Sequence, residues 1–410
     1  MKTETQNGTS ECGADVPIRL KPVLERLQSV SPVVVSHDLA PEILAKIREA
    51  PGANCSSRRA GGILSRHVPA TRRLLQVHRL DWRIVYPLAA AAAVALLLGG
   101  FWLASAKPAD SSQQAVAWLR QTQEPDGSWS SAKWGGDKHF EVALTGLSLM
   151  TLLDGKAGGN VAADKAVASL IRSQQPDGHF GELFSGTPYN QGIATLALAK
   201  AYETRKSEVL RLALDRAVSA ISSRQYADGG WGYHNEARPA SNLSITLWQI
   251  EALRLASAQG WPQVKPQVER GLRWMANVAA DDGSFGYQKS GDTPGGASQT
   301  LTAMGAMSLL DPAHAGLVSP VRRQAIKAQM QRLASTPGPD MDYYRRYFLA
   351  AALKKMDEAA AHKGLAALRH DLVAQQVKGG SDAGSWKADD RWGSSGGRIY
   401  ATAMASLSLR

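Results

Sequence analysis

The most informative segment of this chain is Gln123-Glu-Pro-Asp126-Gly127-Ser-Trp129, where a glutamine, an Asp-Gly pair and an aromatic residue follow one another at short spacing. The phrase returns as Gln174-Gln-Pro-Asp177-Gly178-His-Phe180 and Gln225-Tyr-Ala-Asp228-Gly229-Gly-Trp231, and in shorter form as Ala280-Asp281-Asp282-Gly283-Ser-Phe285 and Asp382-Ala-Gly384-Ser-Trp386. The central glycines are 51, 51, 54 and 101 residues apart, so the last interval spans two periods. A repeat of about fifty residues indicates an array or a closed ring of supersecondary units.

Each repeat carries two helical patterns. A first, charged run ends near the glutamine, and a second run, rich in Ala, Leu, Thr and Ser, follows the turn and a loop. Six such pairs follow one another, from 115–121 with 140–153 to 364–376 with 400–409. The second runs are apolar on nearly every side, and such helices are buried. We therefore predict an all-α fold, an α/α toroid of six helical hairpins over residues 106–410.

A long apolar segment precedes the repeats. Residues 84–105 carry no charge, and this segment is long enough to cross a hydrocarbon core of about 30 Å. Trp82, Tyr86 and Trp102 flank its apolar run as interface anchors do. A buried Ala-rich helix is the alternative. Arginines cluster before the segment, so the positive-inside rule predicts a single-pass protein of the inner (cytoplasmic) membrane, with residues 1–83 in the cytoplasm and the toroid on the periplasmic side.

The predicted cytoplasmic tail has little regular pattern. One short helix is expected near 39–49, and both cysteines, Cys12 and Cys55, lie in the tail, so the toroid has no cysteine. We interpret the tail as a tether first and as a regulatory segment second. The net charge of +11 divides into +5 for residues 1–83 and +6 for the rest, without a concentrated basic stripe, so no nucleic-acid partner is expected.

The spacing Gln-x3-Gly-x-Trp resembles the QW motif of squalene–hopene cyclases and related prenyltransferase-type toroids, over roughly residues 113–410. The fourth repeat has Ala279 where the glutamine belongs, the fifth lacks the motif, and the sixth inserts residues between Gln375 and Gly384. A glycine with positive φ suits such a turn, so the motif residues are expected to be structural. These residues are Gln123, Gly127, Trp129, Gln174, Gly178, Phe180, Gln225, Gly229 and Trp231.

The resemblance implies that function sits in a central cleft, lined by the starts of the second helices and the loops before them. The residues at those positions suggest a polar, mixed rim. The cleft-lining candidates are Asp137, His139, Glu141, Tyr189, Asn190, Gln191, Asn242, Gln299, Tyr343, Arg345, Arg398 and Tyr400.

Chemistry known in related toroids can be compared with these residues. Class II terpene cyclases use an Asp-x-Asp-Asp acid motif, and the nearest string here is Asp340-Met-Asp342-Tyr343, with Tyr in place of the last Asp. The cysteine ligand of a prenyltransferase zinc site is missing, so no metal and no cofactor are expected. The catalytic candidates are Asp340, Asp342 and His139, the last of which also suits a structural role.

Three functions remain open. The first is a membrane-anchored binding or scaffold protein that uses the cleft for a protein or small-molecule partner and catalyses nothing. The second is a diverged terpene or squalene cyclase-like enzyme acting on an isoprenoid lipid, with Asp340 or Asp342 as the acid. The third is a transmembrane sensor that signals through the tail. An aromatic-lined cavity would favour the enzyme, because ring faces stabilise carbocations.

Overall fold

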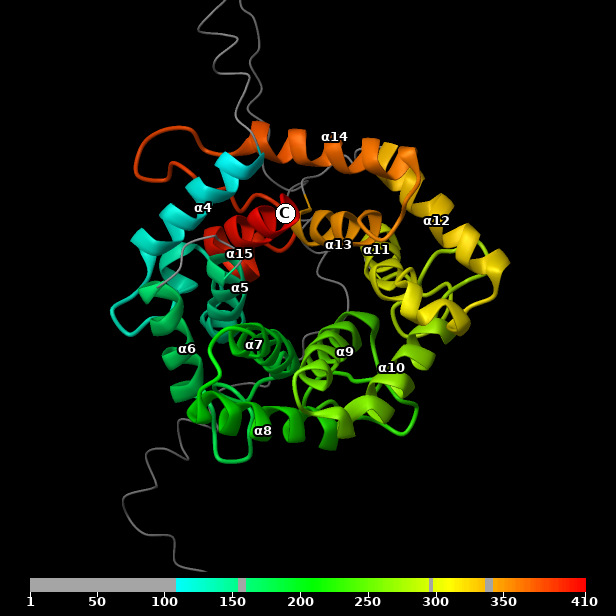
Figure 1. The fold of residues 1–410 in the computed structure, drawn as a ribbon, viewed down its shortest axis with the longest axis horizontal. Helices are drawn as coiled ribbons and strands as arrows, with labels where there is room; N and C mark the ends of the chain where they lie inside the picture. The colour runs from blue at the N-terminus through cyan, green and yellow to red at the C-terminus, as the bar shows by residue number, and fades with distance from the viewer. Residues whose placement is uncertain (1–107, 154–159, 295–297, 336–341) are drawn as a thin grey trace, which may run out of the picture. The chain divides into compact units, whose positions relative to one another are not determined.

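Twelve long helices form two concentric rings in the part of the chain that the structure describes (Figure 1). The structure is a computed structural model, and it describes residues 108–153, 160–294, 298–335 and 342–410. The outer helices are α4 (Pro108–Thr122), α6 (Val161–Ser173), α8 (Glu208–Ser223), α10 (Lys265–Asn277), α12 (Pro320–Ser335) and α14 (Ala359–Gln375). The inner helices are α5 (Glu141–Leu153), α7 (Thr187–Tyr202), α9 (Leu243–Ala258), α11 (Ser298–Leu309), α13 (Tyr343–Leu353) and α15 (Gly393–Ser408).

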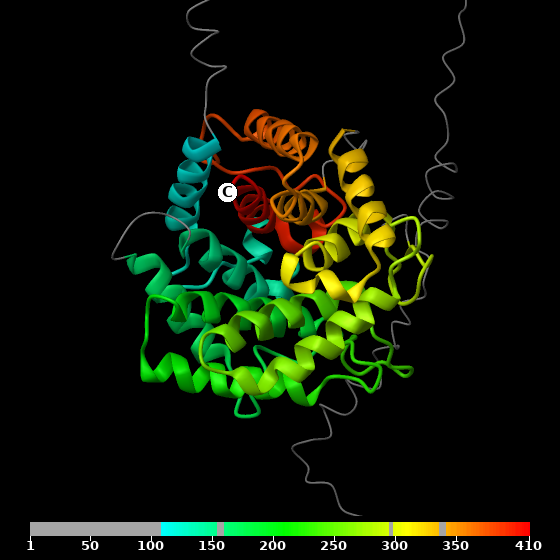
Figure 2. The same cartoon turned by 45° about the vertical axis from the view of Figure 1, so that its right-hand side comes forward.

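The inner helices pack side by side around the centre, and α15 returns to α5 to close the ring (Figures 1 and 2). Ten consecutive residues of α5, from Ala143 to Leu152, are buried, whereas α12 buries only Ile326, Gln329 and Met330. This difference matches the sequence, because the inner helices carry small and apolar residues on every face and the outer helices carry charges. The predicted all-helical α/α toroid is confirmed.

The glutamine of the repeat joins one hairpin to the next. Nε2 of Gln123 donates to the carbonyl of Gly127 at 3.0 Å and to that of Ala162 in α6 at 2.8 Å. One side chain thus fixes its own turn and the following outer helix. The equivalent bonds of the next two repeats join Gln174 to Ala213 in α8 and Gln225 to Gln267 in α10.

In the less regular repeats, different residues make the contact between neighbouring hairpins. In the fourth repeat, Gln329 of α12 donates to the carbonyl of Asp282 at 2.8 Å, across the same junction in the opposite direction. In the sixth repeat, Gln376 donates to the carbonyl of Gly384 and to that of Ser111 in the neighbouring helix α4, each at 2.8 Å. The insertion in this repeat therefore follows Gln376, one residue beyond the predicted Gln375, and the contact closes the ring.

The turn glycines stand where no side chain fits. Gly178 has φ +89°, and a Cβ atom on it would lie 2.3 Å from the carbonyl oxygen of Arg216 in the next outer helix. Gly127 and Gly229 stand in the same way against Lys165 and Arg270. Glycine is needed for both the backbone conformation and the close approach of the next hairpin.

The aromatic residue of the motif locks the two helices of its own hairpin together. Trp129 is fully buried, and its indole N–H donates to the carbonyl of Leu119 in α4 at 2.9 Å. Its backbone N–H donates to Oγ1 of Thr145 in α5 at 3.3 Å. Trp231 makes the same pair of bonds with Ile221 and Thr246. The aromatic residue therefore sets the distance between the inner and outer rings.

Several predicted segments lie outside the described residues. These are the tail 1–83 with its expected helix at 39–49, the apolar segment 84–105, and Asp340. Within the described ranges, no helix is long and apolar enough to cross a membrane. The helix bounds differ modestly from prediction, since α15 begins at Gly393 rather than at 400 and contains a kink at Gly397.

Candidate active site

Asp390 is the most distinctive carboxyl group around the centre of the toroid. It lies in the loop just before α15, and its Oδ2 accepts hydrogen bonds from the Tyr400 hydroxyl at 2.9 Å and the Tyr343 N–H at 3.1 Å. Its Oδ1 accepts one from the Trp392 N–H at 3.2 Å. Burial raises the pKa of Asp390 to about 6, although these three donors act in the opposite direction. A carboxyl group with this pKa holds a proton at mildly acidic pH and can donate it.

A second carboxyl group contributes to this shift. Asp342 caps α13, where its Oδ1 accepts from the Arg345 N–H at 2.8 Å and its Oδ2 accepts from the Thr300 hydroxyl at 2.9 Å. It is 6% exposed, and its negative charge raises the pKa of Asp390 further. Asp342, a predicted catalytic candidate, therefore lies close enough to Asp390 to influence its acidity.

Aromatic rings surround this pair on the side of α13. Tyr343 and Tyr400 meet edge to face with ring centroids 6.5 Å apart, and Tyr344 lies 5.9 Å from Trp392. Trp248 of α9 donates its indole N–H to the Tyr344 hydroxyl at 2.6 Å. Trp248 also stacks on Tyr347 at 6.2 Å with an angle of 9° between the rings. Four elements thus contribute rings to one aromatic cluster next to Asp390.

A second set of rings continues from this cluster. Tyr189 of α7 lies 6.2 Å from Tyr233, whose hydroxyl is hydrogen-bonded to that of Tyr287 at 3.1 Å. Phe140 lies 6.4 Å from Tyr189. Burial raises the pKa of Tyr189 well above its ordinary value, and the hydroxyls of Tyr233, Tyr287 and Tyr344 raise it further. The two sets of rings are therefore close to each other, and together we call them the aromatic wall.

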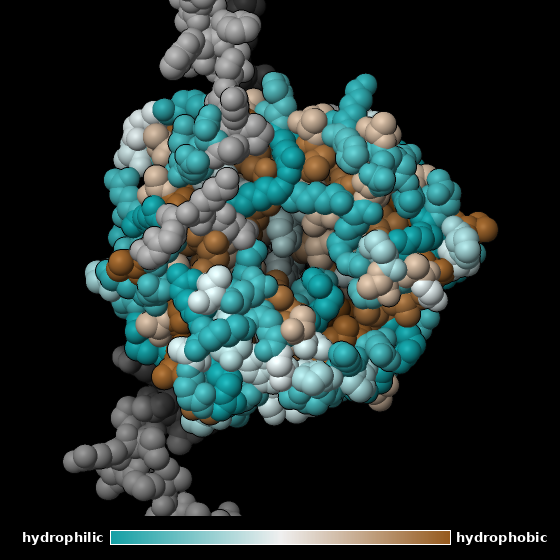
Figure 3. Space-filling view, in the orientation of Figure 1, coloured by the Kyte–Doolittle hydropathy of each residue, from teal (hydrophilic) through white to brown (hydrophobic). Residues whose placement is uncertain are grey.

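The aromatic wall has buried rings, among them Trp248, Tyr343 and Tyr400, and partly exposed ones. Burial raises the pKa of Tyr189, Tyr344 and Tyr347, yet each side chain remains partly exposed to solvent. A side chain that is surrounded by protein and still reached by solvent lines a hollow, and Figure 3 shows a hollow in the middle of the ring. The expected polar, mixed rim is wrong at these positions, because Trp248 and Trp392 lie beside the tyrosines. The cleft candidates were taken only from the starts of the inner helices and therefore did not include these two tryptophans.

The candidates on the first hairpin make other contacts, and the backbone N–H of Asp137 donates to the carbonyl of Ser395 in α15 at 2.9 Å. His139 is exposed and pairs through Nδ1 with Asp137 at 2.7 Å, and its ring packs on Phe184. Glu141 lines a separate cavity of about 210 Å³ between α5 and α6, together with Asp126 and Arg172. Its pKa is raised, first by burial and then by the charges of Asp126 and Glu124. Glu141 was expected in the central cleft, and the rotation of α5 places it on the outer side instead.

The remaining candidates serve mostly to hold the loops. Asn190 is buried and joins α7 to the chain before α5, and Asn242 caps α9 by accepting from Ile245 at 3.0 Å. Gln299 accepts a hydrogen bond from Arg345. Arg398 pairs with Asp382 at 3.2 Å and donates to Ser385, and its charge also acts on Tyr343. Gln191 lies in another cavity, described below. Of the twelve cleft candidates, Tyr189, Tyr343 and Tyr400 thus contribute rings to the aromatic wall.

Sequence reasoning missed Asp390 itself. The signal available was the acidic pair Asp389-Asp390 between Trp386 and Trp392, in the loop that leads into the last inner helix. Among the described residues, no group of three or more His, Cys, Asp or Glu side chains is arranged to hold a metal ion.

Comparison with known protein families identifies the family of this toroid. A sequence model of the prenyltransferase alpha-alpha toroid domain matches residues 82–241 and 233–343. The chain belongs to this family. The match accords with the QW-like repeats and with the two rings of helices, so the predicted membership of the squalene–hopene cyclase and prenyltransferase-type toroids is confirmed.

Curated relatives in this toroid family are enzymes of terpene synthesis. A drimenyl diphosphate synthase of Streptomyces showdoensis is 31% identical over 188 residues, which cover 44% of this chain and 33% of the relative. An enfumafungin synthase of Hormonema carpetanum is 26% identical over 216 residues, covering 50% of this chain and 14% of the relative. The chain thus matches about a third or less of the length of these relatives.

Solved structures with the same fold include the type II terpene cyclase MstE from Scytonema in its apo form. It is 18% identical, with a TM-score of 0.50, and the match covers 74% of this chain and 97% of that one. An α-amylase from Clostridium perfringens is 9% identical, with a TM-score of 0.53, covering 73% and 97%. At these identities the likeness concerns the fold alone.

The relatives correct the first functional expectation, that of a binding or scaffold protein without catalysis. Sequence relatives of this toroid are named as synthases of terpenes, which favours the second hypothesis, a cyclase-like enzyme. The expectation rested on the missing Asp-x-Asp-Asp motif.

Proposed function

We propose that this protein is a terpene cyclase-like enzyme that protonates a carbon–carbon double bond of an isoprenoid lipid and folds the resulting cation into rings. The observation that carries the proposal is the Asp390 carboxyl group, with its pKa of about 6, next to the aromatic wall. The names of the sequence relatives supply the substrate class. Asp390 takes the part that the sequence had suggested for Asp340 or Asp342.

The hydrogen bonds of Asp390 suit proton donation. Oδ2 accepts from both Tyr400 and Tyr343, whereas Oδ1 accepts only the longer bond from Trp392, so the proton resides on Oδ1. When the proton moves to an alkene carbon, the π electrons form the new C–H bond and leave a carbocation. The three donors then stabilise the carboxylate that remains. Asp342 keeps the proton on Asp390 before the reaction because its charge opposes ionisation.

The aromatic wall would act after protonation. The faces of the partly exposed Tyr344 and Tyr347 present negative quadrupole density, which attracts a cation by about 0.5–2 kcal/mol per ring. Attack of a further double bond on the cation closes a ring, and loss of a proton from carbon ends the reaction. The sum is an isomerisation, in which one proton is taken up and one is released.

The experiment incubates the full chain with farnesyl diphosphate, geranylgeranyl diphosphate or squalene in D₂O and analyses the products by mass spectrometry. We expect a cyclic isomer of at least one substrate with a single deuterium. Asp390→Asn should reduce the rate roughly 10²–10⁴-fold, as the loss of a general acid does. Asp389→Asn, which changes the exposed neighbouring residue, is the matched control and should retain the rate. Conversion that persists in Asp390→Asn would exclude Asp390 as the acid, and no conversion of any substrate would contradict the proposal.

We also propose that residues 84–105 anchor the toroid in the inner membrane, with the tail in the cytoplasm. The support is the charge-free segment, its flanking tryptophans and the arginines before it. The family match begins at residue 82 and so includes this segment. Protease treatment of spheroplasts tests the topology: an epitope at the C-terminus should be digested and one at the N-terminus protected, and the reverse pattern would refute it.

A further inference from the structure

Three outer helices carry an exposed valine at their start. Val161 is the first residue of α6 and is 66% exposed. Val209 and Val321 are the second residues of α8 and α12, and they are 64% and 79% exposed. Scattered apolar residues on a surface are ordinary, but these three occupy the same place in three repeats. Their recurrence indicates a surface that contacts something apolar.

The starts of the outer helices lie beside the ends of the inner helices. Asn160, which caps α6, donates to the carbonyl of Leu152 at the end of α5 at 3.1 Å. Arg323 in the first turn of α12 donates to the carbonyl of Leu309 at the end of α11 at 2.7 Å. Only residues 203–207 separate α8 from the end of α7. The three valines therefore share one side of the toroid, which we call the valine side.

The chain also enters the toroid on the valine side. Arg410, which follows α15, donates to the hydroxyl of Ser112 near the start of α4 at 2.9 Å, so α4 also starts beside the end of an inner helix. Residues 106 and 107 alone separate α4 from the apolar segment 84–105, for which we have proposed a membrane span. Two residues reach at most about 7 Å. Anchoring by this segment therefore turns the valine side toward the lipid.

The loops on the two sides of the toroid differ in charge. The six connections from an outer to an inner helix, among them the loop of Asp390, contain 15 acidic and 8 basic residues. The five connections from an inner to the next outer helix contain five of each. A bilayer with anionic lipids repels the first side, and the exposed Lys206 and Lys265 on the valine side can meet its head groups.

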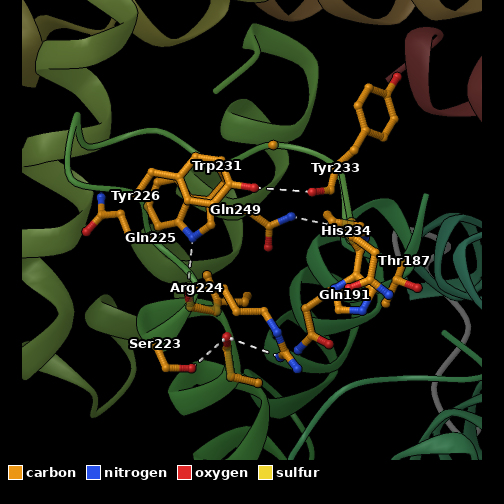
Figure 4. Close-up of a pocket in the computed structure, with 15 residues that line it drawn as sticks. Thr187, Gln191, Ser223, Arg224, Gln225, Tyr226, Trp231, Tyr233, His234 and Gln249 are labelled. Carbon is orange, nitrogen blue, oxygen red and sulfur yellow. Dashed lines mark hydrogen bonds between the residues drawn. The ribbon is translucent and has the colours of Figure 1, made fainter. Parts of the chain in front are cut away.

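The side with the acidic loops is also polar and hollowed. A cavity of about 340 Å³ lies there between α7, α8 and α9, and its lining includes Ser223, Arg224 and Asn235. Figure 4 shows the Arg224 side chain extending toward Gln191, which lines the same cavity. Charged and hydrogen-bonding groups at a cavity mouth are costly to remove from water. This side is therefore suited to water, and the valine side is suited to lipid.

We propose that the valine side of the toroid lies flat on the lipid surface, with Val161, Val209 and Val321 placed among the head groups. In Figure 1, α6 and α8 follow α4 in one direction around the ring, and α12 lies beyond α14 in the other. Contact of all three valines with lipid thus requires the whole side to lie on the membrane. The docking surface rests on the proposed membrane anchor and is independent of the proposed cyclase activity.

The test uses the full chain in nanodiscs of phosphatidylethanolamine and phosphatidylglycerol that contain phosphatidylcholine with a spin label on its head group. Cys12 and Cys55 are replaced by serine, and one bimane fluorophore is attached to Val161→Cys, Val209→Cys or Val321→Cys. The spin label quenches only a fluorophore close to it, so we expect quenching at all three positions. Leu183→Cys is the matched control, because Leu183 is 51% exposed and lies in a connection on the opposite side. Its fluorescence should be unchanged.

A second set of variants separates docking from mere tethering. Val209→Asp together with Val321→Asp should reduce the quenching at Val161→Cys by roughly half or more, because charged side chains leave the head-group region. Leu183→Asp should leave that quenching unchanged. Quenching confined to Val161→Cys, or equal quenching at Leu183→Cys, would overturn the docking surface but not the anchor. A chain that does not copurify with the nanodiscs would refute the anchor and the docking surface together.

Discussion

The hydroxyl of Tyr400 donates a 2.9 Å hydrogen bond to Oδ2 of Asp390, so the last inner helix holds the carboxyl group of the loop that precedes it. Tyr400 lies on α15 beyond the kink at Gly397, and Asp390 lies before that helix begins. The bond therefore ties the position of the carboxyl group to the body of the toroid. Its loss should change the acidity of Asp390 without removing the group.

Tyr400→Phe should move the pH profile of turnover. The Tyr400 hydrogen bond lowers the pKa of Asp390, so its removal raises that pKa above about 6. A general acid works only while protonated, so the alkaline decline of the rate should shift to higher pH. The rate is measured from pH 4 to 9. Tyr347→Phe is the control, since Tyr347 has no contact with Asp390, and its profile should be unchanged. An unshifted profile in Tyr400→Phe would contradict the assignment of Asp390.

Asp390 should also make stability depend on pH. Its folded pKa is raised, so its contribution is fully present below its unfolded pKa near 3.8 and is lost as pH rises through about 6. The shift corresponds to about 3 kcal/mol, reduced to about 1–2 kcal/mol because the side chain is partly exposed. Asp390→Asn avoids this loss. Its free energy of unfolding relative to the wild type should rise by about that amount from pH 4 to pH 7, as measured by urea denaturation. Asp389→Asn should show no such trend.

Gly178→Ala should destabilise the toroid much more than an equally strained glycine elsewhere. Gly178 and Gly291 both have positive φ, +89° and +79°, but only at Gly178 would a Cβ meet backbone, the carbonyl of Arg216. Gly291→Ala should cost about 1 kcal/mol for the conformation alone, and Gly178→Ala about 2–4 kcal/mol because the next hairpin must move. Thermal unfolding of both variants measures the difference. Equal losses would mean that the turn does not fix the neighbouring helix.

Gln376→Leu should weaken the closure of the ring. Its amide donates to Ser111 and Gly384, and without it both carbonyls lose a buried donor, which costs about 1–3 kcal/mol. Gln375→Leu changes the exposed residue beside it and should be nearly neutral. Urea denaturation compares the two, and hydrogen exchange in α4 should rise only in Gln376→Leu. A larger loss in Gln375→Leu would restore the register expected from the sequence.

The repeat predicted the architecture because its residues make the same contacts in each of the first three hairpins. Gln123, Gly127 and Trp129 interact with groups at fixed distances along the chain, so their spacing carries the three-dimensional information. The position of the motif glutamine was predicted wrongly only in the sixth repeat, at Gln376. The inserted loop there changes the spacing between glutamine and glycine but keeps the hydrogen bond between them. The repeats in the sequence therefore correspond to hydrogen bonds that recur from one hairpin to the next.

The candidate site was much less predictable. Burial raises the pKa of Asp390, and the groups that modify it are Tyr400 of the same hairpin and Tyr343 and Asp342 of the preceding one, a meeting that no local motif encodes. Trp248 and Tyr347 stand one to two turns inside their helices, beyond the helix starts from which the cleft was predicted. Glu141 is at a helix start, yet it lines the cavity between α5 and α6, and Arg398 follows the kink inside α15 and pairs with Asp382. The side of the helix on which a residue lies therefore determines whether it contributes to the candidate site.

The hydrogen bond from Gln376 to Ser111 also bears on how the gene can be cut and rejoined. It repeats the bond of the first three junctions, and Arg410 reaches Ser112 at 2.9 Å, so the end of α15 adjoins the start of α4. The packing of the hairpins therefore does not depend on which hairpin comes first in the chain. A circular permutant that joins residues 410 and 108 by a short linker and opens the exposed connection between α7 and α8 should fold to the same toroid.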